Sequence, residues 1–303
     1  MQSQPEIKTL NLPNGETYAY REAGDINNSR VLICLQGGME SSRAFTHLFP
    51  LLSDSFRVIA FDARGHGQSS YHKELNSYDC LTQDVREFVE ALGIKKAWFL
   101  GRSVGGGVSM KLAANYPDLV EGIILHSSIG IQGFICPKAD EHGKDTCERA
   151  CTKDECINHP HSLRLADVVA KKNVEMITWL HKNRYYCGKA QPDPEDLQAK
   201  VDDYLSCKVV PIYVYLTNFF NISNEHNGVV QGTGEVDKIK CPILIIHGEK
   251  SVIIKVEEAK RTKEWFGDRA ELKIFPEAGH LISQDHPEEV SDLIKEFCKV
   301  TTA

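Results

Sequence analysis

Short apolar runs alternate with amphipathic stretches through the first 130 residues of the chain. The apolar runs end in glycine or small polar residues, as buried parallel strands do. They are VLICLQGG (31–38), FRVIAFDARG (56–65), KAWFLGRS (96–103) and VEGIILHSS (120–128). Residues 81–92 and 108–117 carry apolar positions at helical spacing, and the first of these stretches stops at Gly93. This alternation predicts a parallel sheet with helices on both of its faces.

The same alternation returns in the last quarter of the chain. CPILIIHGE (241–249) and ELKIFPEAG (271–279) predict two further strands. Helical patterns follow them at residues 255–265 and 287–298. Near the N-terminus, ETYAYREAG (16–24) predicts an antiparallel strand added at the edge of the sheet.

Between residues 131 and 235 the alternation stops. Three segments there have helical patterns, and a polar, cysteine-rich loop precedes them. The segments are LRLADVVAKKNVEMITWLHKN (163–183), DPEDLQAKVDDYL (193–205) and VPIYVYLTNFF (210–220). We therefore predict an α/β protein whose mostly parallel, doubly wound sheet is built from residues 1–130 and 236–303. Residues 131–235 are predicted to form a helical, cysteine-rich cap inserted between two of its strands.

The sequence GRSVG (101–105) follows a predicted strand and precedes a predicted helix. In that context G-x-S-x-G indicates a nucleophile elbow, a strained turn that projects a serine hydroxyl above the sheet. Ser103 is therefore the candidate nucleophile. The Val104 amide stands at the start of the helix, where a backbone N–H is suited to hold an oxyanion. A glycine-rich tight turn is the purely structural alternative.

His280 follows the last predicted strand and comes after Ser103 in the chain. A serine hydroxyl is a poor nucleophile until a base takes its proton, and histidine has a pKa near the working pH. His280 is therefore the candidate base.

QGG (36–38) closes an early strand, and small residues there let the backbone approach a carbonyl. This predicts the Gly38 amide as a second oxyanion donor.

Composition excludes some classes of function. The 303 residues are 42% hydrophobic and carry a formal net charge of −7, and a protein of this kind lacks the basic footprint of a general nucleic-acid binder. No apolar run approaches 18 residues, and the N-terminal segment has no apolar core typical of a signal peptide. We expect a cytoplasmic location, unless a leader has been removed, and a small-molecule substrate without nucleic-acid or membrane partners.

Five motifs in order give the chain a resemblance to the capped branch of the α/β-hydrolase superfamily, which includes esterases and C–C bond hydrolases. They are QGGMESS (36–42), FDARGHGQS (61–69), GRSVGG (101–106), HGEKSVII (247–254) and AGH (278–280). The resemblance implies Ser103 as nucleophile, His280 as base, and the Gly38 and Val104 amides as the oxyanion hole. It implies no cofactor. A serine nucleophile also distinguishes the chain from the epoxide and haloalkane hydrolases, which use aspartate.

Two positions depart from the family pattern. The histidine that commonly opens the HG motif is Gln36 here, which affects the hydrogen bonding around the oxyanion loop but not its backbone donors. The larger departure is at the acid. The residue after HGEK is ordinarily the aspartate of the catalytic triad, and here it is Ser251. A triad acid fixes the histidine tautomer and stabilises the imidazolium, and an uncharged serine can do only the first of these well. Three interpretations stay open at this point. Glu249 is a substitute acid, or Ser103 and His280 act as a dyad helped by Ser251 or a water, or the scaffold is a non-catalytic or very slow small-molecule receptor.

Six of the ten cysteines fall in the predicted cap, and their state is open. They are Cys136, Cys147, Cys151, Cys156, Cys187 and Cys207. Disulfides and free thiols are the main alternatives. Zinc binding is the weakest alternative, because the spacing is not the paired C-x₂-C of common zinc sites, and we assign no metal site.

Four aromatic residues of the same region, Tyr213, Tyr215, Phe219 and Phe220, are predicted to pack as core between cap and sheet, in preference to lining an acyl pocket. The whole pattern predicts a serine hydrolase acting on an ester or related acyl bond of a small, partly apolar substrate.

Overall fold

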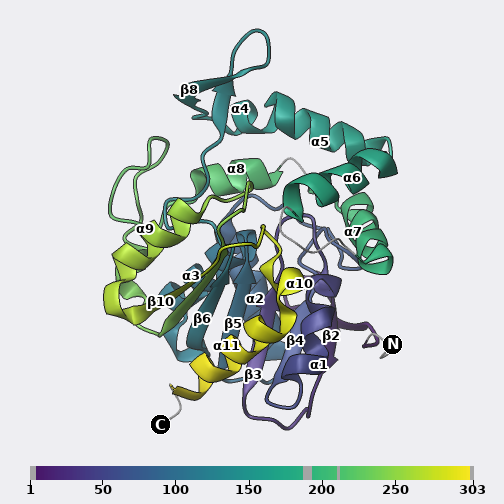
Figure 1. Cartoon of the computed structure of the whole chain (residues 1–303), viewed down its shortest axis with the longest axis vertical. Helices are drawn as coiled ribbons and strands as arrows, with labels where there is room; N and C mark the ends of the chain where they lie inside the picture. Colours follow the sequence, from purple (N-terminus) through teal and green to yellow (C-terminus); the bar gives the residue numbers. More distant parts are fainter. Residues whose placement is uncertain (1–4, 187–192, 210–211, 301–303) are drawn as a thin grey trace.

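An eight-stranded sheet forms the centre of the molecule (Figure 1), with strand order β1-β2-β4-β3-β5-β6-β9-β10. The computed structural model describes residues 5–186, 193–209 and 212–300. The strands are β1 (Lys8–Asn11), β2 (Thr17–Ala23), β3 (Val31–Leu35), β4 (Arg57–Phe61), β5 (Ala97–Arg102), β6 (Val120–His126), β9 (Ile243–Gly248) and β10 (Ala270–Phe275). All pairs from β4 across to β10 are parallel. The predicted mostly parallel sheet is confirmed.

The N-terminal edge differs from the prediction in one respect. β2 is antiparallel to β4, as expected, but it is not the edge strand because β1 pairs with its other side. β1 is four residues long and almost entirely exposed. A strand that buries so little has no apolar alternation, so its sequence carries no signal for a strand.

Helices cover both faces of the sheet. Successive side chains of a strand point to opposite faces, so Ile33 and Leu32 of β3 enter different hydrophobic clusters. The cluster of Ile33 includes side chains of α2 (Tyr78–Ala91), α3 (Val104–Asn115) and α9 (Val256–Phe266). The cluster of Leu32 includes side chains of α1 (Phe49–Leu52), α10 (Ile282–Asp285) and α11 (Pro287–Val300). Short 3₁₀ turns at Ser42–Leu48, Pro117–Leu119, Glu235–Lys238 and Gly267–Arg269 complete this part.

Helix α3 is packed closely against the strands beside it. A Cβ atom on Gly105 would lie 2.3 Å from the Leu35 carbonyl oxygen, and one on Gly101 would lie 2.4 Å from the Gly105 carbonyl oxygen. Only glycine permits backbone to approach backbone this closely. These contacts fix where α3 begins, and therefore where the residue before it, Ser103, is held.

The chain between β6 and β9 lies beyond one end of the sheet (Figure 1). Its helices are α4 (Lys153–Ile157), α5 (Pro160–Ala170), α6 (Val174–Leu180) with a π-helical turn (His181–Tyr185), α7 (Pro194–Ser206) and α8 (Ile212–Phe219). The three predicted helical segments are present, although the first is split between α5 and α6, where Lys172 has a φ of 50°.

The polar loop predicted before these helices contains a two-stranded hairpin, β7 (Pro137–Ala139) and β8 (Asp145–Arg149). Its residues are half-buried or exposed, so its sequence has no apolar alternation. Cys187 lies outside the described residues. Within the described ranges, no helix combines the length and apolar character needed to span a bilayer.

Candidate active site

Ser103 stands at the junction of β5 and α3 in a strained backbone conformation. Its φ of 50° and ψ of −113° are unusual for a residue with a Cβ atom. The turn is held by hydrogen bonds from the Ser103 amide to the His126 carbonyl (3.0 Å) and from the Gly106 amide to the Ser103 carbonyl (3.1 Å). A non-glycine residue with positive φ at a strand-to-helix turn is the geometry of a nucleophile elbow. We call residues 101–105 the elbow.

A cavity of about 150 Å³ opens beside Ser103. Ser103, Gly38, Val104 and His280 all line it, so the structure brings these predicted site residues together. A Cβ atom on Gly38 would lie 3.7 Å from a methyl group of Val104, an ordinary van der Waals distance that places the two residues side by side. Within the described chain, neither the Gly38 nor the Val104 amide donates a hydrogen bond to a protein group. Both N–H groups are therefore available to an oxygen atom in the cavity.

His280 is buried, with 2% of its surface exposed. Its Nδ1 atom lies 3.2 Å from the Ser251 Oγ atom. Its backbone amide donates to the Tyr185 carbonyl at 3.2 Å, which ties the π-helical turn of the insertion to this residue. Ser251 therefore stands at the position where a triad acid would contact the histidine.

Ser251 belongs to a turn, residues 248–254, that we call the acid turn. The Ser251 amide donates to the Gly248 carbonyl (3.1 Å), and the Ile254 amide donates to Ser251 Oγ (3.4 Å). The ring of His247 donates from Nε2 to the Ile254 carbonyl (2.9 Å) and closes the turn. Glu249 is exposed in this turn, whereas Ser251 and His280 are buried, and the hydrogen-bond partner of His280 Nδ1 among the described residues is Ser251.

Burial keeps His280 neutral. Removal of the ring from water lowers the pKa of His280 to about 3, and the nearby His247 contributes in the same direction. The carboxylate of Glu40 opposes this shift, and the Arg102 guanidinium adds to it. His280 is thus a neutral imidazole at physiological pH, able to accept a proton but weakly basic.

A buried ion pair next to the elbow was not anticipated from the sequence. Arg102 Nη1 lies 2.9 Å from Glu40 Oε1, and Glu40 Oε2 accepts the Gly37 amide at 2.9 Å. Arg102 also donates from Nη2 to the Ala44 carbonyl (3.0 Å) and to Ser283 Oγ (3.2 Å). The sequence feature that could have predicted this ion pair is Arg102 itself, because a charged residue at the end of a buried strand needs an oppositely charged partner.

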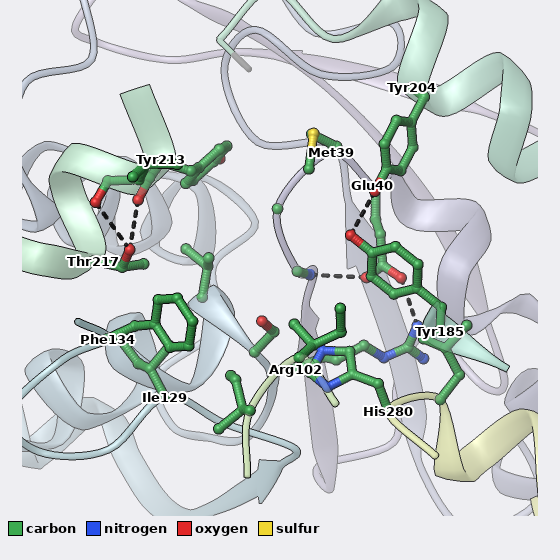
Figure 2. Close-up of a pocket in the computed structure, with 18 of the residues that line it drawn as sticks. Met39, Glu40, Arg102, Ile129, Phe134, Tyr185, Tyr204, Tyr213, Thr217 and His280 are labelled. Atoms are coloured by element: carbon green, nitrogen blue, oxygen red, sulfur yellow. Dashed lines mark hydrogen bonds and ion pairs between the residues drawn. The ribbon is translucent and has the colours of Figure 1, made fainter. Parts of the chain in front are cut away.

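The π-helical turn and α7 of the inserted segment supply one wall of the cavity (Figure 2). His181, Tyr185 and Tyr204 line it, with the Tyr204 hydroxyl donating to that of Tyr185 at 2.6 Å. The Tyr185 ring meets the His280 ring edge-on, with 6.0 Å between centroids. The hydrophobic periodicity of the sequence predicts that such residues lie on helices, but it does not predict which of their side chains point into a cavity.

The opposite wall in Figure 2 carries Ile129, Phe134, Tyr213 and Thr217. Of the four aromatic residues predicted to be core, Tyr213 lines the cavity, where its ring lies 3.7 Å from the position of a Cβ on Gly38. The others pack away from it: the Tyr215 and Phe219 rings are 4.8 Å apart, and Phe220 packs on Tyr78 at 4.6 Å. Tyr213 is therefore part of the predicted core and also of the cavity wall, where its ring turns toward Gly38.

The nine described cysteines are free thiols. No group of three or more His, Cys, Asp or Glu side chains in the described part of the chain is arranged to hold a metal ion.

Comparisons with known proteins agree with this fold. Residues 30–147 match the family model described as alpha/beta hydrolase fold. "Serine hydrolase-like protein" from Danio rerio is 36% identical over 280 residues, which cover 89% of this chain and 82% of that protein. "Epoxide hydrolase 4" from Mus musculus is 21% identical over 95% of this chain and 78% of its own length. The chain belongs to the α/β-hydrolase family.

Solved structures show the same fold. An esterase from Exiguobacterium antarcticum superposes with a TM-score of 0.74 at 19% identity, covering 96% of this chain and 99% of that one. A bromoperoxidase from Bacillus anthracis gives a TM-score of 0.75 at 19% identity, covering 97% of this chain and 100% of its own. At such low identity these likenesses describe the fold alone.

Proposed function

We propose that this protein is a slow serine hydrolase that cleaves an ester or related acyl bond in a small, partly apolar substrate. The observation that carries the proposal is the convergence of the strained Ser103, the buried neutral His280 and two free backbone amides on one cavity. A strained serine at a strand-to-helix turn costs stability, and such strain accumulates at functional sites.

In the proposed reaction, Ser103 Oγ attacks the substrate carbonyl carbon while His280 Nε2 takes the hydroxyl proton. The carbonyl oxygen becomes an oxyanion held by the Gly38 and Val104 amides. The imidazolium then gives its proton to the departing alkoxide, which leaves an acyl group on Ser103. A water molecule attacks that acyl-enzyme, again with His280 as base, and releases the acid.

Ser251 is proposed to orient the base. The Ser251 Oγ atom already accepts the Ile254 amide, and its second lone pair faces His280 Nδ1. Accepting the Nδ1–H fixes the tautomer in which Nε2 is free to take the proton of Ser103. Ser251 carries no charge, so it contributes little to stabilising the imidazolium.

Glu40 is proposed to supply part of the missing charge. Its carboxylate lines the same cavity and favours the protonated form of His280, although its bonds to Arg102 and Gly37 reduce that effect. Loss of a triad aspartate lowers kcat by about 10⁴-fold in known cases, and we expect turnover in that reduced range.

The cavity limits the acyl group. A cavity of about 150 Å³ accommodates a molecule about the size of benzene. Apolar side chains such as Ile129, Ile253 and Leu281 form much of its lining. We therefore propose short or single-ring acyl groups as substrates.

The test is active-site labelling with a fluorophosphonate probe, together with p-nitrophenyl esters of short acids. Ser103 is expected to carry the label, and rapid mixing is expected to show a burst of p-nitrophenol followed by slow turnover. The Ser103→Ala variant is the control and should lose both signals. Tight binding of an ester with neither label nor burst would identify a small-molecule receptor instead and overturn the proposal.

A further inference from the structure

Two buried thiols meet in the inserted segment, outside the candidate active site. Cys136 precedes strand β7 and Cys156 lies in helix α4, and they are 4% and 0% exposed. The Cys136 thiol donates to the Pro137 carbonyl at 3.5 Å. With Ala150 they form a hydrophobic cluster of only three buried residues, against which side chains of α8 pack.

Hydrogen bonds from Asn218 of α8 hold the two cysteines in place. Its Nδ2 donates to Cys156 Sγ at 3.3 Å and to the Ala150 carbonyl at 2.8 Å, and its Oδ1 accepts the Cys136 amide at 2.9 Å. The Ala150 amide also donates to the Cys136 carbonyl at 2.9 Å. Asn218 and Ala150 therefore hold the two cysteines side by side in this cluster.

The surroundings of Cys156 favour its thiolate. The neighbouring Cys136 thiol and the hydrogen bond from Asn218 lower the pKa of Cys156 against the effect of its burial, and the guanidinium of Arg149 adds to the lowering. By contrast, the pKa of the buried Cys207 thiol is raised by its burial to about 12. The thiolate is the nucleophile in thiol–disulfide exchange, so Cys156 is the more reactive of these buried sulfurs.

We propose that Cys136 and Cys156 are a redox pair that forms an intramolecular disulfide. The Cys156 thiolate attacks one sulfur of a low-molecular-weight disulfide and expels one thiolate. The Cys136 thiolate then attacks the Cys156 sulfur and expels the second. The protein loses two electrons and two protons, and the small disulfide becomes two thiols. Both sulfurs are buried, so the first attack takes place when this small cluster opens locally.

The bond would close residues 137–155, including the β7–β8 hairpin, onto α4. Helix α4 packs on α8, and Tyr213, Val214 and Thr217 of α8 line the cavity. Oxidation would therefore fix the position of one cavity wall. The proposal does not depend on the chemistry of Ser103.

The sequence makes the pairing measurable. Trypsin cleaves after Lys138, Lys144, Arg149, Lys153 and Arg164, so four cysteines of the segment fall in four separate peptides. These are 112–138 with Cys136, 145–149 with Cys147, 150–153 with Cys151, and 154–164 with Cys156.

The folded full-length protein is incubated with mixtures of reduced and oxidised glutathione, denatured with N-ethylmaleimide to block thiols, digested and analysed by mass spectrometry. A cross-link between peptides 112–138 and 154–164 is expected to predominate and to disappear on reduction. It should be lost in Cys156→Ser and retained in Cys151→Ser, a matched change at an exposed cysteine.

Two results would overturn the proposal. In the first, Cys136 and Cys156 both carry the maleimide under conditions that convert Cys151 to a mixed disulfide. In the second, the main cross-links join Cys147 or Cys151 to other residues. If Cys156→Ser fails to fold, the wild-type peptide map alone still decides between these outcomes and the expected one.

Discussion

The elbow and the acid turn lie at the ends of two strands of one sheet, β5 and β9. The elbow keeps the strained serine of the family pattern, whereas the acid turn lacks its aspartate. The elbow is strained and closely packed: Ser103 has a φ of 50°, and a Cβ atom on Gly105 would meet the Leu35 backbone. In the acid turn, hydrogen bonds of Ser251 and His247 form a regular structure around a residue without charge.

This difference separates two tasks that a triad aspartate performs together. The acid turn still presents a hydrogen-bonding oxygen 3.2 Å from His280 Nδ1, so it can orient the ring. The charge has no counterpart at position 251, and the carboxylate that acts on the pKa of His280 is that of Glu40, which is shared with Arg102. A histidine that is oriented by an uncharged residue is the arrangement of a slow enzyme. The following predictions test this comparison between the elbow and the acid turn.

The largest effect is expected from Ser251→Asp. A carboxylate beside Nδ1 restores the stabilisation of the imidazolium, and kcat should rise by up to about 10⁴-fold, or about 5.5 kcal/mol. Ester hydrolysis under saturating substrate measures this. Glu249→Gln is the matched change at an exposed position and should leave kcat unaltered. No gain in the first variant combined with a loss in the second would make Glu249 the acid.

Glu40→Gln is expected to lower the free energy of unfolding by about 3 kcal/mol, because it leaves the buried guanidinium of Arg102 without its charged partner. Urea denaturation measures this loss. The double variant Glu40→Leu/Arg102→Leu removes both charges and should recover much of it. The single variant should also lower kcat more than it changes KM, and an unchanged kcat would remove Glu40 from the mechanism.

The pH dependence provides the third test. With a pKa of about 3, His280 stays neutral between pH 5 and 7.5, so kcat/KM should have no inflection near 6.5. A histidine with an ordinary pKa of about 6.5 would lose about thirtyfold by pH 5. In Ser251→Asp the new carboxylate raises the pKa of His280, so an acidic limb should appear within this range. An acidic limb near 6.5 in the wild type would contradict a neutral, desolvated base.

The same shift affects stability. Below pH 6.5 the unfolded chain binds a proton at His280 and the folded protein does not. Protonation therefore favours the unfolded chain, and the free energy of unfolding falls progressively as the pH falls from about 6.5 toward 3. Denaturation midpoints measured at several pH values should fall over that range.

The smallest effect is expected from relief of strain. Ser103→Gly should be more stable than Ser103→Ala by about 1 kcal/mol, because glycine adopts positive φ without steric cost. At the acid turn the order should reverse: Ser251 is outside the positive-φ residues of the described chain, so Ser251→Gly should be less stable than Ser251→Ala. Equal stability of Ser103→Gly and Ser103→Ala would show that the elbow is unstrained.

Much of the frame could be predicted from the sequence because local burial leaves a periodic trace. The strands with fully buried faces, β3, β4, β5 and β9, appeared as uninterrupted apolar runs. GRSVG could be recognised as a nucleophile elbow because the elbow is a local structure, formed by glycines adjacent in sequence to the serine. Elements that bury little, such as β1 and the β7–β8 hairpin, left no such trace.

The sequence by itself thus determined the sheet, the elbow and the absence of an aspartate at position 251. The tertiary structure alone decided which side chains meet: Arg102 with Glu40 across 62 residues, and Ser251 with His280 across 29. It also left Glu249 exposed next to the buried Ser251 and placed Cys136 and Cys156 in one small hydrophobic cluster. The physical reason is that periodicity records whether a residue is buried, whereas contacts across strand ends depend on how distant segments pack.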